Sequence, residues 1–227
     1  MQRKISFAEG EFYHIYNRGT DKRTIYLDEH DFFRFQFLLY ICNGSVPVNI
    51  REQFPKGLTF GDIVSIKRGE ELVDICAYCL MPNHFHILVR AKGDRGISQF
   101  FAKLSTAYSM YFNKRYGRSG GLFEGTFKAL HVENDDYLKY LLSYIHLNPI
   151  KIIEPDWRDQ KMIDLNAAKN FLNQYRYSSY KDFLQERRPE RLILNRGALP
   201  EYFQNFINFE DYIDSWLTFD RLDFTKV

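Results

Sequence analysis

Two histidines stand two residues apart in the segment Asn83-His84-Phe85-His86-Ile87-Leu88-Val89. The apolar residues around them favour a β-strand, in which successive side chains alternate, so both imidazoles are expected on the same face. A metal ion could be held between two imidazoles placed in this way. Histidine pairs at this spacing often occur by chance, so a second chemical group must converge on them before a site is indicated.

A second group of chemically capable residues lies in a helix expected to end at Asn148, before Pro149. At 100° per residue, one stripe of this helix contains Tyr137, Tyr140, Tyr144 and Asn148. The neighbouring apolar stripe consists of Leu138, Leu141, Leu142 and Ile145. The helix should pack by its leucines and hold its tyrosines toward the histidine strand. Spacing alone does not decide between packing and catalysis, nor among the three tyrosines.

The elements that must position these residues follow from hydrophobic periodicity and turn signals. The expected elements are a strand at Phe12–Arg18, a helix from Asp28 to Gly44, strands at Glu71–Leu80 and His84–Ala91, a helix from Ile97 to Gly117, a strand at Thr126–Glu133, and the tyrosine helix capped by Asn134 or Asp135. This order predicts an α+β fold of the ferredoxin-like plan, an antiparallel sheet with helices packed on one face.

The length of 227 residues suits one main domain, expected at residues 1–150. Residues 45–71 are rich in proline and glycine and are interpreted as an inserted loop. Beyond Lys151 the pattern becomes irregular, with a helix expected at Leu165–Tyr175. Residues 151–227 are therefore expected to form an accessory, mainly helical C-terminal extension.

Composition narrows the class of protein. The net charge of +2 is nearly neutral, so the whole chain is not a strongly basic nucleic-acid binder, although local basic clusters exist. Three cysteines are too few for a secreted disulfide framework. No apolar run approaches the length of a bilayer span, and the N-terminal residues lack a signal-peptide pattern. We expect a cytoplasmic protein without a membrane partner.

The segment Cys79-Leu-Met-Pro-Asn-His-Phe-His-Ile-Leu-Val resembles the His-hydrophobic-His motif of single-tyrosine HUH transposases, including the REP-associated tyrosine transposases. The segment Tyr137-Leu-Lys-Tyr-Leu-Leu-Ser-Tyr-Ile-His-Leu-Asn-Pro resembles their nucleophile helix. Further collinear matches lie at residues 13–19, 117–128 and 177–180. The resemblance spans about residues 10 to 182. The insertion at 45–71 and the tail after about 185 depart from the pattern.

The resemblance implies an HUH domain in which Tyr144, placed before Ile-x-x-Asn-Pro, is the catalytic nucleophile. It implies metal ligation by His84 and His86, with Asn148 completing the site. Mg or Mn is the expected ion. Attack on single-stranded, hairpin-forming DNA would give a 5′-phosphotyrosine and a free 3′ hydroxyl. The resemblance also makes a homodimer plausible.

Several cations are candidates for contacting DNA phosphates. They are Arg18, Lys22, Arg23, Lys103, Lys114, Arg115 and Lys128. A base that removes the phenol proton is not evident from the sequence. His146 lies nearly opposite Tyr144 on the helix and is a poor candidate, whereas His14 and His131 remain open.

Three alternatives remain. A non-enzymatic DNA-binding module could hold zinc through Cys76, Cys79, His84 and His86, but on a continuous strand the two cysteines are expected to face opposite sides. A domesticated relative could process repeated hairpins of its host genome with the same chemistry. A plasmid or phage nickase would also use this chemistry, although the collinear transposase motifs weigh against it.

Overall fold

The computed structural model describes residues 6–49, 59, 62, 65–157, 164–204 and 209–218. Its first half contains β1 (Phe12–Arg18), η1 (Thr20–Lys22), α1 (Glu29–Cys42), β2 (Val73–Met81), β3 (His84–Ala91), α3 (Gly96–Arg115) and β4 (Lys128–His131). Its second half contains α4 (Asp135–Leu147), η3 (Asn148–Ile152), α5 (Leu165–Gln174), α6 (Tyr180–Phe183), η4 (Pro189–Ile193), η5 (Arg196–Ala198), α7 (Glu201–Gln204) and α8 (Phe209–Thr218).

The four strands form one antiparallel sheet in the order β2-β3-β1-β4. With α1 between β1 and β2 and α3 between β3 and β4, this is the ferredoxin-like plan. The predicted α+β fold and the antiparallel sheet are confirmed. The predicted hairpin is also present, since Met81 and His84 are paired across the Pro82–Asn83 corner.

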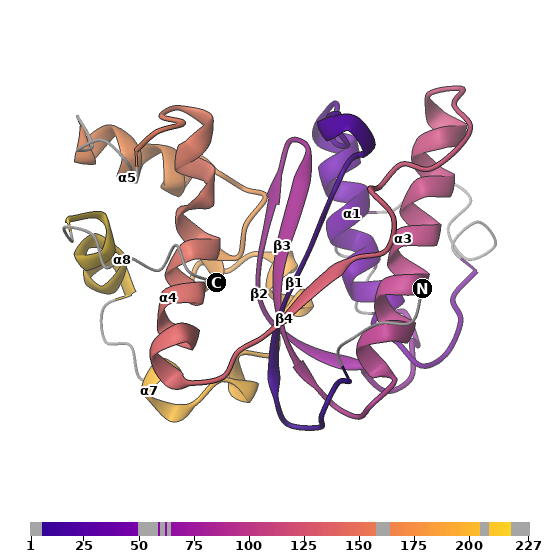
Figure 1. Ribbon diagram of the computed structural model, residues 1–227, viewed down its shortest axis with the longest axis horizontal. Helices are drawn as coiled ribbons and strands as arrows, with labels where there is room; N and C mark the ends of the chain where they lie inside the picture. The colour runs from indigo at the N-terminus through magenta and orange to yellow at the C-terminus, as the bar shows by residue number, and fades with distance from the viewer. Residues whose placement is uncertain are drawn as a thin grey trace.

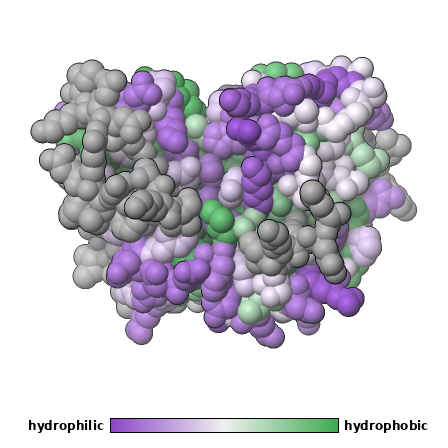
Figure 2. Space-filling view, in the orientation of Figure 1, coloured by the Kyte–Doolittle hydropathy of each residue, from purple (hydrophilic) through white to green (hydrophobic). Residues whose placement is uncertain are grey.

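Helices cover both faces of this sheet, so the expectation of helices on one face was wrong. Figure 1 shows α1 and α3 on one side of the edge-on sheet and α4 with the C-terminal helices on the other. Every residue of β2 is buried, and β3 is buried along most of its length. A sheet whose central strands are apolar on both faces requires a layer on each. Hydrophilic side chains predominate on the described part of the face in Figure 2, with hydrophobic ones in small patches.

The C-terminal extension runs along β2, the edge strand of the sheet. Its backbone donates from Ser179 N to Tyr78 O at 2.9 Å and from Asn195 N to Ile75 O at 2.8 Å. It also accepts at Tyr177 O from Leu80 N at 2.9 Å. These bonds occupy groups that an exposed edge strand would leave open to pairing with another chain.

Further sequence predictions concern the cap of α1, the helix α5 and the 45–71 insertion. The predicted helix at Leu165–Tyr175 is α5, and Asp28 is the N-cap of α1 as expected. Part of the 45–71 insertion, residues 50–58, 60, 61, 63 and 64, lies outside the described residues. None of the helices in the described ranges is long and apolar enough to cross a membrane.

The start of α4 is fixed by Asn134, whose side-chain oxygen accepts a hydrogen bond from Tyr137 N at 2.8 Å. We predict that Asn134→Ala lowers the free energy of unfolding by about 1 kcal/mol, because a first-turn N–H loses its acceptor. Asn134→Asp is the matched control, since an aspartate accepts the same bond and should stay within a few tenths of wild type. Urea unfolding measures both, and equal midpoints for Asn134→Ala and wild type would contradict this role.

Candidate active site

Strand β3 places apolar side chains on one face of the sheet and two histidines on the other, because successive side chains alternate. Phe85 and Ile87 point into the apolar core that includes residues of α1 and α3. His84 and His86 lie on the opposite face, which Leu88 shares with the core beneath α4, and their ring centroids are 5.0 Å apart. The structure therefore confirms the expectation that both imidazoles lie on one face, the one that α4 covers.

Tyr144 is the helix tyrosine that the fold brings to this histidine pair. Its ring meets the ring of His86 edge-on, with centroids 5.1 Å apart, and that of His14 at 6.0 Å. Tyr140 lies one turn before Tyr144, with ring centroids 6.0 Å apart, and the ring of Tyr137 is 6.1 Å from that of Tyr140. The tyrosine stripe thus runs away from the histidines, with Tyr144 at its near end.

The hydrogen bonds of the two histidines determine which ring nitrogen carries the proton and which keeps a lone pair. His84 Nδ1 lies 2.6 Å from Asn83 Oδ1, which can only accept, so Nδ1 carries the proton and Nε2 keeps its lone pair. His86 Nδ1 lies 2.8 Å from His14 Nε2. In the tautomer that places this proton on His86, His86 also presents an Nε2 lone pair.

Burial keeps the imidazoles of His14 and His84 neutral. Desolvation lowers the pKa of His14 to about 3. Desolvation, followed by the positive charges of Lys151 and Arg18, lowers the pKa of His84 to about 4. Because a protonated imidazole has no lone pair for a metal, the lowered pKa keeps His84 in the form that can bind a metal at neutral pH.

Asn148 adds an oxygen to the same region. Its side chain is fully buried, and its Nδ2 donates to Tyr144 O at 3.2 Å. Its Oδ1 has no hydrogen-bond partner among the described residues. A buried oxygen without a partner costs about 1–3 kcal/mol unless a donor or a cation meets it. This orphaned oxygen, one helical turn after Tyr144, therefore fits a metal ligand.

The described His, Cys, Asp and Glu residues include no group of three that could hold a metal ion. The proposed ligands differ from such a group, since they are two imidazoles and the amide oxygen of an asparagine. Two imidazoles and one amide oxygen are donor types that a divalent ion such as Mn accepts, with water or substrate oxygens as further ligands.

Two residues of this region carried no functional signal in the sequence. Lys151 follows α4 and places its Nζ 5.8 Å from the ring centroid of Tyr144. Tyr16 is paired with His86 in the register of β1 and β3, and their rings are 6.0 Å apart. Alternation along β1 puts Tyr16 on the face of His14, but only the register between strands brings both to His86.

The basic residues proposed for DNA contact fall into two sets. Arg18 is paired with His84 in the sheet and forms an ion pair with Glu124 at 2.5 Å. Lys128 on β4 lies 5.9 Å from the ring centroid of Tyr16. Lys22 and Arg23 follow β1, and Lys22 O accepts from Asn83 Nδ2 at 3.1 Å. Arg18 thus lies on the strand beside the histidines and Lys128 one strand further, whereas Arg23 pairs with Asp21 at 3.4 Å.

The second set lies on α3, on the other face of the sheet (Figure 1). Lys103 donates to Gly44 O, and Lys114 is exposed at the helix end. Arg115 pairs with Asp28 at 2.5 Å and with the fully buried Asp31 at 2.9 Å. The contacts of Lys103 and Arg115 with their own chain account for those two residues without DNA.

The other histidines have partners outside the site. His146 is fully buried, with Nε2 at 2.8 Å from Ser179 Oγ. His131 is exposed and pairs with Glu11 at 2.8 Å. His14 is the one of the two open base candidates that touches the site, through His86.

The two cysteines of the zinc alternative lie on one face of β2 rather than on opposite faces. A register shift between Ile75 and Ala77 places both Cys76 and Cys79 in the core beneath α4, so they share a face, contrary to expectation. The bulge inserts one residue and resets the alternation. Burial raises the pKa of both thiols, which keeps them protonated and disfavours metal ligation. The absence of a three-residue metal group in the described ranges agrees with this.

Comparison with known proteins agrees with the motifs. Residues 58–148 match the family model described as "Transposase IS200 like", which confirms the resemblance to IS200-like transposases of the HUH type. The matched range contains His84, His86, Tyr144 and Asn148. The resemblance is thus to DNA-processing enzymes of the transposase class. No curated protein matches the chain.

Two solved structures are similar over most of the chain. One is a REP-associated tyrosine transposase bound to a REP hairpin, with 13% identity and a TM-score of 0.49, covering 88% of each chain. The other is the tRNA(His) guanylyltransferase of Saccharomyces cerevisiae, with 12% identity and a TM-score of 0.35, covering 89% of this chain and 86% of that one. Likenesses of this size do not identify a chemistry.

The placement of Arg115 yields a prediction that separates folding from DNA contact. Arg115→Ala leaves the buried Asp31 without its cation and should lower the free energy of unfolding by about 2 kcal/mol, a value reduced because Arg115 is partly exposed. Lys114→Ala removes a neighbouring exposed cation and should change stability by less than about 0.5 kcal/mol. Urea unfolding provides the comparison. An unchanged Arg115→Ala midpoint together with weaker DNA binding would restore Arg115 as a DNA contact.

Proposed function

We propose that this protein is a transposase-type strand transferase in which Tyr144 attacks a phosphodiester of single-stranded DNA. The observation that carries the proposal is the approach of the Tyr144 ring to His86 and His14 on the sheet face that presents His84. A phenol that lies edge-on to His86 and near the neutral imidazole of His14, on the face that carries His84, fits tyrosine attack with metal assistance.

In the proposed step, Tyr144 Oη forms a bond to phosphorus and loses its proton. The bond from phosphorus to the 3′ oxygen breaks, and that oxygen gains a proton. The products are a 5′-phosphotyrosine and a free 3′ hydroxyl. Because one phosphodiester replaces another, attack by a different 3′ hydroxyl can reverse the step and transfer the strand without an external energy source. The Lys151 ammonium lies close enough to Tyr144 to attract the negative charge that develops on the phenol oxygen.

His84, His86 and Asn148 are the residues that would hold a divalent ion, Mg or Mn. When bound, the ion would polarise a non-bridging oxygen of the scissile phosphate. Asn83 and His14 fix the ring orientation of the two histidines through their Nδ1 atoms. Imidazole ligands favour Mn over Mg in softness, while metal availability sets occupancy.

We propose single-stranded, hairpin-forming DNA as the substrate, on the basis of the motif resemblance. Arg18 is paired with His84, and Lys128 is paired with Tyr16, which is itself paired with His86. Both cations therefore lie on the β1 side of the histidine strand and are candidates for contacting the DNA phosphates. A domesticated role in processing genomic repeats would use the same residues and the same chemistry.

Covalent capture of DNA tests the nucleophile. We expect a denaturation-resistant adduct when the protein is mixed with a hairpin oligonucleotide from its own genomic flanks and Mn or Mg. The 3′-labelled fragment should stay with the protein, and the 5′-labelled fragment should leave with a free 3′ hydroxyl. Tyr144→Phe should reduce adduct formation at least about a thousandfold, because the attacking oxygen is gone.

Tyr140→Phe and Tyr137→Phe are matched controls on the same helix stripe and should retain the adduct. Persistence of the adduct in Tyr144→Phe, with loss in one of these controls, would assign the nucleophile to that tyrosine instead. No adduct with any flanking sequence would contradict a strand-transfer function.

The proposed metal site has a test that does not depend on activity. Titration of Mn followed by electron paramagnetic resonance should show one site that is lost in His84→Ala and in His86→Ala. His14→Ala should weaken Mn binding about 10- to 100-fold, since it releases the ring that orients His86. His131→Ala, an exposed histidine away from the site, should bind as wild type does. Wild-type affinity in His14→Ala would show that His14 does not position His86.

A further inference from the structure

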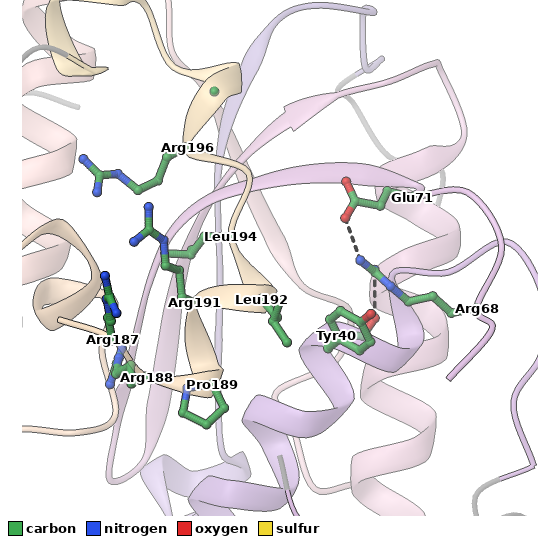
Figure 3. A pocket seen from close by; sticks show the side chains of 11 residues that line it. Tyr40, Arg68, Glu71, Arg187, Arg188, Pro189, Arg191, Leu192, Leu194 and Arg196 are labelled. Atoms are coloured by element: carbon green, nitrogen blue, oxygen red, sulfur yellow. Dashed lines mark hydrogen bonds and ion pairs between the residues drawn. The ribbon is translucent and has the colours of Figure 1, made fainter. Parts of the chain in front are cut away.

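A second basic site lies on the β2 edge of the sheet. An open pocket of about 800 Å³ is formed there by α1, the segment before β2 and the C-terminal extension. Figure 3 shows Arg187, Arg188, Arg191 and Arg196 on one side and Arg68, Glu71 and Tyr40 on the other. Five arginines thus face a single glutamate among the lining residues. We refer to this site as the arginine pocket.

Three of these arginines are held in place by their own chain. Arg188 pairs with the fully buried Asp182 through Nε at 2.8 Å. Arg68 pairs with Glu71 at 2.6 Å and lies over the ring of Tyr40, 3.8 Å from its centroid. Arg196 donates to Asp182 O at 2.9 Å. These contacts hold the three side chains in place and pair Arg188 and Arg68 with the carboxylates of Asp182 and Glu71.

The other two arginines have no such partner. Arg187 and Arg191 are exposed and form no ion pair with the residues that the structure describes. Burial lowers the pKa of Arg196, and the adjacent positive charge of Arg191 lowers it further. The pocket therefore holds uncompensated positive charge, which an anion with several oxygens would neutralise.

The chemistry of the lining points to phosphate. Guanidinium groups present paired N–H donors that match phosphate oxygens in a bidentate way. Several separate guanidinium groups around an open pocket suit a ligand with more than one phosphate, rather than a single small anion. A DNA backbone and a free nucleoside triphosphate share this chemistry.

The position of the pocket favours the DNA backbone. The pocket borders β2 near Ile75, whereas His86 is paired with Cys79 further along the same strand. Four residues along the strand span about 13 Å and the step to the next strand about 5 Å, so Ile75 and His86 are on the order of 14 Å apart. At 3.4 Å per base pair, this separation equals about four base pairs of a duplex stem. One DNA hairpin could therefore occupy both sites.

We propose that the arginine pocket binds backbone phosphates of the double-stranded stem that adjoins the strand cleaved at Tyr144. This inference rests on the proposed function. The pocket uses Arg68 from the insertion and Arg187 to Arg196 from the tail, which are the two segments that depart from the transposase pattern. It thus gives these segments a role in anchoring the substrate without reading its sequence.

The salt dependence of DNA binding tests the proposal. The probe is a fluorescent hairpin with a stem of about 12 base pairs of arbitrary sequence, because backbone contacts carry no sequence information. Fluorescence anisotropy gives the binding constant over a range of salt concentrations. The slope of log K against log salt is negative, and we expect the double variant Arg187→Gln/Arg191→Gln to reduce its magnitude by about 2, since two phosphate contacts are lost.

Matched variants separate a specific pocket from general charge. Arg187→Lys/Arg191→Lys retains the charge and should retain most of the slope. Lys139→Gln/Lys169→Gln removes two cations from α4 and α5, whose partners are Asp136 and Asp214, and should leave the slope unchanged. Both arginines are exposed, so equal urea midpoints should show that the glutamine variant is folded.

Each outcome has a defined meaning. An unchanged slope in Arg187→Gln/Arg191→Gln, or an equal loss in Lys139→Gln/Lys169→Gln, would overturn the pocket as a stem anchor. Tight ATP binding that depends on Arg187 and Arg191, without any effect on the slope, would assign the pocket to a free polyphosphate and also overturn it. The covalent adduct on a stemless oligonucleotide at saturating concentration reports the proposed function separately. The rate of adduct formation should be normal in Arg187→Gln/Arg191→Gln and lost in Tyr144→Phe. Tyr144→Phe should in turn keep the wild-type slope of log K against log salt.

Discussion

The site depends on strand β3, which has a neighbouring strand on each side and helices over both faces. This position forces its side chains to alternate between two buried environments. Phe85 and Ile87 fill the core on the α1 side, and His84 and His86 must then lie beneath α4. A slip of one residue in the register would exchange the two sets and remove both the core contacts and the histidine pair at once. The fold and the site are thus set by the same alternation.

Placing imidazoles in such a position costs free energy unless their polar atoms are paired. Asn83 occupies Nδ1 of His84, and His14 occupies Nδ1 of His86. These bonds satisfy one nitrogen of each ring and fix the ring orientation. Because His14 comes from β1 and Asn83 from the turn before β3, the orientation depends on the sheet as a whole. The orphaned Oδ1 of Asn148 has no equivalent compensation among the described residues, which is the reason to assign it to an ion.

The sequence predicted features that depend on local rules. The caps Asp28 and Asn134, the hairpin at Pro82 and the common face of the two histidines follow from neighbouring residues alone. The stripe of leucines on α4 showed that the helix is packed, but an amphipathic pattern does not say which face of a sheet it covers. The alternation rule failed at Cys76, because a bulge is set by pairing with β3 rather than by the strand itself.

The same limit applies to the site. Tyr144 was distinguished from Tyr137 and Tyr140 by motif resemblance, and the structure adds its short distance to His86. His14 and Lys151 needed the tertiary structure, since one reaches the site through strand register and the other through the chain beyond Pro149. Interactions between residues far apart in sequence leave no periodic trace, so no local pattern could have assigned them.

Charge shows how a nearly neutral chain can still favour a polyanion. The net charge of +2 arises because 29 acidic residues nearly balance 31 lysines and arginines, but the two signs are not mixed evenly in space. The buried carboxylates of Asp31 and Asp182 are matched by Arg115 and Arg188, and these pairs add little to the outer field. The exposed cations that remain near the histidine site and in the arginine pocket then act on solvent-borne ligands within about one Debye length. Local potential rather than net charge governs encounter with a polyanion, so the composition of the chain alone does not reveal its arginine pocket.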